Sequence, residues 1–184
     1  MPGRRDDGAT TGGRFPRAII RWQTLDGAYA GGRGGERAIT TGVRGFSPAA
    51  LVQLRRSRGL TQERLGELIG RARTNVIRWE KLVDTPSPRY LVKVASALQV
   101  RPWQLTSVDP AEATLADLRA WAGLTQLELA DAAGLPRSTY SLLERGGLPL
   151  RADLAEGIAA VLGCDASEVE AAYRRAKAST PAEA

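Results

Sequence analysis

The chain has 184 residues, of which 43% are hydrophobic and 25% charged, and its net charge is +6. This length allows one or two domains, and the positive charge favours polyanionic partners. The sequence has no histidine and a single cysteine, Cys164, which excludes histidine-based catalysis, a disulfide framework and a zinc site of the usual ligands. We find no motif for the serine–lysine or paired-carboxylate enzymes that remain, so we expect no enzyme, no cofactor and no metal site.

The charge is distributed unevenly along the chain. Residues 1–45 carry a net charge of +4, residues 46–106 carry +7, and residues 107–184 carry −5. An excess of arginine can reflect GC-rich coding, but coding bias would not make one half basic and the other acidic. The basic segment therefore favours a polyanionic partner, and the acidic segment does not.

The first 45 residues are rich in glycine and arginine, with clusters such as TTGGR and AGGRGGER. Ordering a glycine-rich segment costs much conformational entropy, so we expect a flexible arm here. Two stretches, 17–22 and 36–43, have strand-like composition, and in an alternative interpretation they pair as a short hairpin.

From Ser47 onward the sequence predicts helices, and it repeats with an offset of 64 residues. The segment LRRSRGLTQ at 54–62 returns as LRAWAGLTQ at 118–126. The same offset, without a gap, also aligns Leu65 with Leu129, Gly70 with Gly134, Arg73 with Arg137, Glu80 with Glu144, and Leu98 with Leu162. We therefore expect two copies of one structural unit, over residues 46–106 and 107–178, and a tail over 179–184.

Caps, first-turn prolines and glycines divide each copy into five predicted helices. Ser47-Pro48, Ser87-Pro88 and Asp109-Pro110 each place a capping residue before a proline, and glycines fall where helices should end. The first copy is predicted helical over 48–58, 62–69, 73–82, 88–99 and 102–106. The second is predicted helical over 111–121, 126–133, 137–145, 151–162 and 166–177. The expected fold class is all-α, with two tandem five-helix units after the arm.

The second and third helices of each copy have the spacing of two helices that cross on a short turn. Such a crossing needs a small residue at the closest approach, which Gly66 or Ala130 supplies, and a turn residue that tolerates positive φ, which Gly70 or Gly134 supplies. The segments RRSRGLTQERLGELIGRARTNVIRWEK and LRAWAGLTQLELADAAGLPRSTYSLLERG resemble the Cro/repressor-type (XRE, lambda repressor-like) helix-turn-helix family. The resemblance covers most of residues 47–176.

The resemblance implies roles for two groups of residues. An arginine on the first helix of such domains commonly pairs with a glutamate at the end of the third, which implies structural salt bridges between Arg55 and Glu80 and between Arg119 and Glu144. The third helix enters the major groove with its N-terminal residues facing the bases. The DNA-binding residues implied for the first copy, on the bases or on flanking phosphates, are Gln62, Arg71, Arg73, Thr74, Asn75, Arg78, Lys81 and Arg89.

The second copy departs from this pattern. Its matching positions for DNA contact are Gln126, Arg137, Ser138 and Thr139, but Leu142 stands where the first copy has an arginine and cannot hydrogen-bond a base. Its negative charge also repels phosphate. Three roles remain open: auxiliary DNA binding, dimerisation, and contact with a protein partner.

Together these features predict a sequence-specific DNA-binding transcriptional regulator whose first copy reads double-stranded DNA. The alternative is a protein-interaction or antitoxin-like adaptor that keeps the fold without reading DNA. A homodimer or another protein partner would use residues 107–178. No hydrophobic run approaches the roughly 20 residues of a membrane helix, and the first residues lack a signal peptide's apolar stretch. We therefore expect a cytoplasmic protein without membrane contact, associated with the nucleoid.

Overall fold

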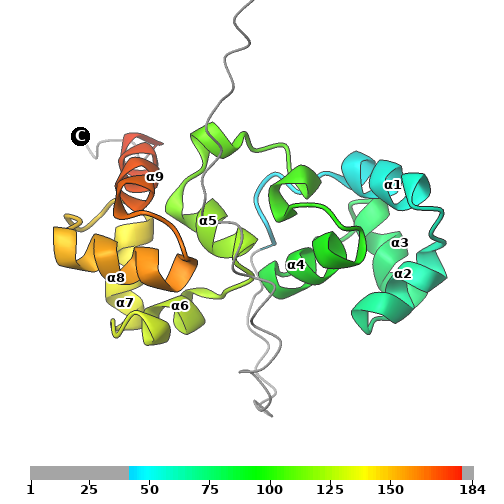
Figure 1. Cartoon of the computed structure of the whole chain (residues 1–184), viewed down its shortest axis with the longest axis horizontal. Coiled ribbons are helices and arrows are strands. Elements are labelled where there is room, and N and C mark those ends of the chain that lie inside the picture. The colour runs from blue at the N-terminus through cyan, green and yellow to red at the C-terminus, as the bar shows by residue number, and fades with distance from the viewer. Residues whose placement is uncertain (1–41, 180–184) are drawn as a thin grey trace, which may run out of the picture.

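The computed structural model describes residues 42–179, and these residues are all-α with one isolated β-bridge (Figure 1). Residues 1–41, with most of the expected arm and hairpin, and residues 180–184 of the expected tail lie outside the described residues. The first copy contains α1 (Pro48–Ser57), α2 (Gln62–Ile69), α3 (Arg73–Glu80), α4 (Pro88–Ala97) and the 3₁₀ helix η2 (Pro102–Leu105). The second contains the 3₁₀ helix η3 (Pro110–Glu112), α5 (Leu115–Trp121), α6 (Gln126–Ala132), α7 (Arg137–Glu144), α8 (Ala152–Leu162) and α9 (Ala166–Ser179).

The internal repeat is present in three dimensions and in the same register. Helices α2, α3 and α4 begin at residues 62, 73 and 88, and their counterparts α6, α7 and α8 begin 64 residues later, at 126, 137 and 152. The buried residues of the two cores follow the same offset: Leu51 and Leu115, Leu65 and Leu129, Val76 and Tyr140, Trp79 and Leu143, Val94 and Ile158, Leu105 and Val169. Both tandem units of the expected all-α fold are therefore confirmed.

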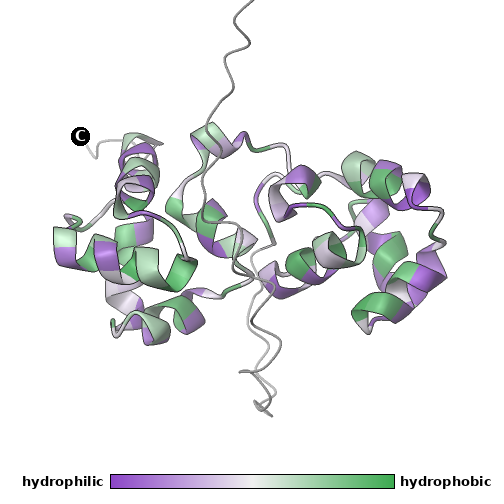
Figure 2. Ribbon diagram, in the orientation of Figure 1, coloured by the Kyte–Doolittle hydropathy of each residue, from purple (hydrophilic) through white to green (hydrophobic). Residues whose placement is uncertain are grey.

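Each copy has its own hydrophobic core, and its helices are amphipathic. Hydrophobic and hydrophilic residues lie side by side along the helices in Figure 2, as expected for helices that bury one face. Leu65 and Leu91 are fully buried in the first core, and Leu129 and Ile158 in the second. No helix within residues 42–179 is long and apolar enough to cross a membrane.

Two predicted helices differ from the structure. The expected helix at 102–106 is a short 3₁₀ turn, and the expected helix at 111–121 is divided into η3 and α5. The division occurs at Ala113, which is 1% exposed because it packs into the first core. A new helix then begins after Thr114, which forms a capping box with Asp117. Contact with the other copy thus overrides the local helical preference.

The two copies share an apolar junction between α4 and α5, which lie at the centre of the molecule (Figure 1). Ala113, Ala120 and Trp121 of the second copy belong to the core of the first. The rings of Trp103 and Trp121 lie 6.1 Å apart. Because core side chains of both copies interdigitate here, the junction restricts the orientation of one copy relative to the other.

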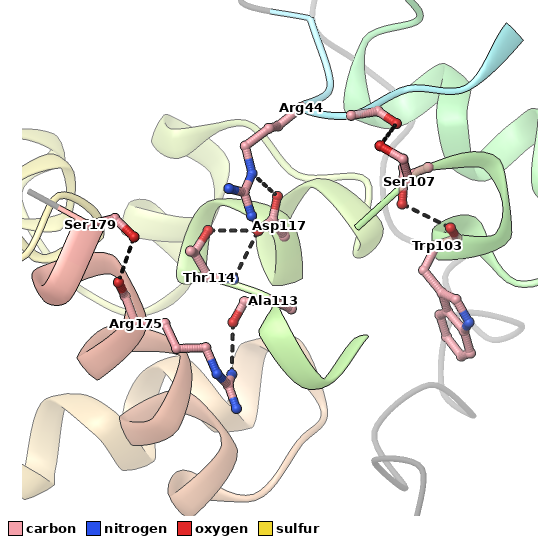
Figure 3. A network of polar contacts seen from close by, with 10 residues as sticks. Arg44, Trp103, Ser107, Ala113, Thr114, Asp117, Arg175 and Ser179 are labelled. Atoms are coloured by element: carbon pink, nitrogen blue, oxygen red, sulfur yellow. Dashed lines mark hydrogen bonds and ion pairs between the residues drawn. The ribbon is translucent and has the colours of Figure 1, made fainter. Parts of the chain in front are cut away.

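A short segment before α1, residues 42–47, ties this junction together. Arg44 donates two hydrogen bonds to the carboxylate of Asp117, which is 3% exposed, and this bonding raises the pKa of Arg44 (Figure 3). The backbone N–H of Ser107 donates to the carbonyl of Gly45 over 2.7 Å, and Phe46 forms the β-bridge with Thr106. Residues 42–45, which the sequence analysis places in the arm, are therefore packed against both copies.

Candidate nucleic-acid interface

Local sequence sets the angle between α2 and α3. The hydroxyl of Thr61 caps α2 by accepting from the N–H of Arg64 over 3.0 Å, and Gly70 ends the helix in the left-handed region at φ +69°. At the crossing, a Cβ added to Gly66 would lie 2.6 Å from the carbonyl oxygen of Arg71. Only glycine therefore allows the turn to approach α2 this closely.

Helix α3 buries one face and exposes the other. Val76 and Trp79, three residues apart, are 0% and 4% exposed, and they anchor the helix to the first core. Arg73 and Thr74 are exposed in the first turn, and Asn75 is half-buried beside them. The Asn75 N–H donates to the carbonyl oxygen of Ala72. No side chain caps the N-terminus of the helix, so the N–H groups of Arg73 and Thr74 can donate to an acceptor from outside.

An ion pair fixes the C-terminal end of α3 to α1. Arg55 donates to both carboxylate oxygens of Glu80, over 2.6 and 3.2 Å, and to the carbonyl oxygen of Leu60 over 2.7 Å. Both side chains of the pair are less than a tenth exposed. Burial acts to raise the pKa of Glu80, but hydrogen bonds from Arg55 and Gln62 outweigh it and hold the pKa below its ordinary value.

Gln62 takes part in this arrangement, which the sequence did not predict. Its side-chain nitrogen donates to Glu80 over 2.7 Å, so the first residue of α2 is tied to the last residue of α3. The side chain is half-buried. This bond holds the start of α2 at a fixed distance from α3. It leaves the oxygen and the second N–H of the Gln62 side-chain amide for other partners.

The predicted cations flank α3, and most of them have no acidic partner among residues 42–179. Arg73, Lys81 and Arg89 are exposed without an ion pair in that range, whereas Arg78 lies 3.8 Å from Asp84. Arg71 lies with its guanidinium over the ring of Tyr90, 4.1 Å from the centroid. The predicted basic residues thus lie on α3, directly before and after it, and in the first turn of α4.

Two residues of this region, Tyr90 and Lys93, were not identified from the sequence. Tyr90 is half-buried on α4, and the ammonium of Lys93 lies 5.4 Å from the centroid of its ring. Their three-residue spacing, with Arg89 alongside, was the signal that could have found them, because it places both on one helix face. The contact of Tyr90 with Arg71, which lies in the turn before α3, depends on tertiary packing and cannot be predicted from spacing along the sequence.

The second copy forms the same ion pair in the same geometry. Arg119 donates to both oxygens of Glu144 over 3.0 and 2.8 Å and to the carbonyl of Leu124 over 2.8 Å. Burial lowers the pKa of Arg119, but its bonds to Glu144 outweigh this effect and leave the pKa raised.

Comparison with known families matches the helix-turn-helix family twice, over residues 51–102 and 115–169. The chain belongs to this XRE, lambda repressor-like helix-turn-helix family. The family makes it a DNA-binding regulator of the XRE type. A search of curated proteins gives no match.

The two helix-turn-helix copies differ on the exposed face of their third helix. In α7, Arg137 and Ser138 are exposed and Thr139 is half-buried, as is Gln126 at the start of α6. Leu142 is 41% exposed where the first copy has Arg78. Leu127 of α6 is 50% exposed as well. At these two positions, where the first copy has Glu63 and Arg78, the second copy therefore exposes apolar side chains in place of charged ones.

Proposed function

We propose that this chain is a sequence-specific transcriptional regulator whose first helix-turn-helix copy reads the major groove of double-stranded DNA with α3. The observation that carries this proposal is the exposed first turn of α3, where Arg73 and Thr74 face away from the core. Arg73 has no ion-pair partner among residues 42–179. Its charge is therefore available to a ligand that the free protein lacks.

Each side chain of this surface has a distinct part in the proposal. Arg73 donates two hydrogen bonds to the O6 and N7 of a guanine, which discriminates against other bases by about 1–3 kcal/mol. Thr74, Asn75 and Arg78 contact neighbouring bases or phosphates. Gln62 contacts a backbone phosphate from the start of α2. The flanking phosphate contacts are Arg71, Lys81 and Arg89.

The second copy has a different proposed role, which is dimerisation or contact with a protein partner, with weak DNA contacts through Gln126, Arg137, Ser138 and Thr139 as an auxiliary function. Its acidic composition repels phosphate, and exposed Leu127 and Leu142 suit an apolar partner surface. These features also support the alternative function, an adaptor that contacts proteins only. On the leading proposal the protein is cytoplasmic and associated with the nucleoid.

Salt-dependent binding separates the two functions. Binding of the full chain to a random-sequence DNA duplex of about 30 base pairs is measured at several salt concentrations, followed by selection of preferred sequences from the pool. Neutralisation of about 4–6 phosphates predicts a log–log slope of about −4 to −5. Selection should enrich one motif. No binding at low salt, together with a salt-resistant complex with a protein partner, would establish the adaptor instead.

A further inference from the structure

An aromatic side chain with two cations beside it lies next to the start of α3. We propose that Tyr90 orients Arg71 and Lys93 as one phosphate-binding cluster for the backbone of duplex DNA, adjacent to the end of α3 that reads bases. This inference rests on the proposed function and deepens it. It adds Lys93 as a phosphate contact and Tyr90 as a positioning residue.

The residues of the cluster come from two different elements. Arg71 lies in the turn before α3, with its guanidinium carbon 4.1 Å from the ring centroid of Tyr90. Lys93, one turn further along α4, has its ammonium nitrogen 5.4 Å from the same centroid. Both distances are within the roughly 6 Å over which a cation is attracted to the face of an aromatic ring. The side chains of Arg71 and Lys93 therefore both lie against this ring.

Contact with α3 holds the Tyr90 ring in place. Tyr90 packs at 6.1 Å, centroid to centroid, against Trp79 of α3, and Trp79 is 4% exposed. The residue that anchors α3 in the core therefore also positions the ring that orients the cations. The distance between the base-reading turn of α3 and the cation cluster is consequently fixed within one packed unit.

No acidic side chain within residues 42–179 neutralises the charge of the cluster. Arg71 and Lys93 form no ion pair with any of residues 42–179, and the neighbouring Arg89 is exposed and unpaired in the same range. Arg71 and Lys93 carry like charges beside one ring, and a bound phosphate offsets the repulsion between them. Because the ring already restricts two of the side chains, less conformational entropy is lost when phosphate binds.

The second copy provides an internal comparison, because the repeat replaces every member of the cluster. At the 64-residue offset, Leu135 stands for Arg71, Leu154 for Tyr90, Gly157 for Lys93 and Asp153 for Arg89. The scaffold helices α6, α7 and α8 nevertheless keep their positions in the repeat. The fold of a copy therefore does not require the cluster, which favours a ligand-binding role over a purely structural one.

The first test compares two lysines that are equally charged and differently placed. Lys93→Ala removes a cation on α4 of the first copy, and Lys177→Ala removes one on α9 of the second copy (Figure 1). Each full-chain variant is titrated with a random-sequence duplex of about 30 base pairs at several salt concentrations. We expect Lys93→Ala to reduce the log–log salt slope by about 0.9, the value for one phosphate, and Lys177→Ala to leave it unchanged. Equal slopes for the two variants would overturn the inference.

The second test addresses the positioning role of Tyr90. Tyr90→Phe keeps the aromatic face and should stay within about twofold of the parent affinity, whereas Tyr90→Leu removes it and should weaken binding about fivefold. Combining Tyr90→Leu with Lys93→Ala should cost less than the product of the single effects, because Tyr90 acts through Lys93. Independent effects, or a loss with Tyr90→Phe equal to that with Tyr90→Leu, would contradict this role.

The outcome also distinguishes this inference from the proposed function. If the parent chain does not bind the duplex at low salt, the proposed function fails. If the parent binds and Lys93→Ala behaves as Lys177→Ala does, only the cluster is wrong. Thermal unfolding of each variant shows whether Tyr90→Leu is folded, and Lys93→Ala and Tyr90→Phe decide the matter if it is not.

Discussion

The two helix-turn-helix copies of this chain keep the same frame and carry different surfaces. In both, an arginine of the first helix donates hydrogen bonds to the glutamate that ends the third helix. The same arginine also donates to the backbone carbonyl of the residue five positions after itself. The corresponding distances in the two copies differ by at most about half an ångström. On the surface, Arg78 is replaced by Leu142 and Arg89 by Asp153. The internal bonds are conserved between copies because they determine the fold, whereas the exposed positions are free to change with the partner.

The crossing of the second and third helices differs in detail as well. The first copy has Gly66 at the closest approach, with no room for a Cβ, and the second has a fully buried Ala130 at the same position. The two turns therefore approach their helices to different extents. The first residue of the third helix is nevertheless exposed in both copies, at Arg73 and at Arg137.

The largest expected effect tests whether the frame is truly shared. Arg55→Ala and Arg119→Ala should each lower the free energy of unfolding by about 3–5 kcal/mol, because each leaves a buried carboxylate without its partner. Urea denaturation of the full chain, monitored by circular dichroism, measures both. A loss in one copy only would mean that the two ion pairs have different structural weight.

The next effect concerns the helix crossing. Gly66→Ala should destabilise the protein by about 2–3 kcal/mol, because the added methyl group meets the backbone carbonyl of Arg71, which only a shift of the turn can relieve. The reverse change, Ala130→Gly, should cost about 1 kcal/mol, the ordinary helix preference for alanine. Equal costs in chemical denaturation would show that the two turns are equally tight.

A smaller effect separates the two exposed surfaces. Arg73→Ala should weaken binding to the preferred duplex by about 2 kcal/mol, and Arg137→Ala, at the same place in the second copy, by less than about 0.5 kcal/mol. Fluorescence anisotropy at constant salt measures both affinities. If Arg137→Ala costs as much as Arg73→Ala, both copies read DNA.

The smallest expected effect is a pH dependence of the first copy. The pKa of Glu80 is lowered in the folded chain, so its ionised form contributes stability at neutral pH. That contribution is lost as the pH falls from the ordinary glutamate pKa through the lower folded value. Denaturation midpoints between about pH 6 and 3 should therefore fall less steeply for Glu80→Gln than for the parent. If the midpoints of Glu80→Gln and the parent fall equally steeply with pH, Glu80 does not contribute to the loss of stability in acid.

Most of the fold could be predicted from the sequence because short local patterns mark where the helices begin and end. Caps, prolines and the 64-residue repeat predicted the starts of α2, α3 and α4 and of their counterparts to within one residue. Both ion pairs were predicted from the resemblance to the helix-turn-helix family, not from spacing alone. Arg73 and Thr74 could be placed on the exposed side because Val76 and Trp79 mark the buried side.

The junction and the cation cluster could not be predicted in the same way. Arg44 and Asp117 are 73 residues apart, and no periodicity connects them. The break at Ala113 arises because the first core buries that residue, which a cap pattern at Asp109 does not reveal. The contact between Arg71 and Tyr90 likewise depends on how α4 packs beside the turn.

Protection of guanine N7 from methylation most directly tests the claim that α3 of the first copy reads the major groove. The preferred duplex is treated with dimethyl sulfate in complex with the parent chain, Arg73→Ala and Arg137→Ala. We predict one guanine that the parent and Arg137→Ala protect and that Arg73→Ala leaves reactive. The same protection by all three proteins, or its loss with Arg137→Ala alone, would contradict the account.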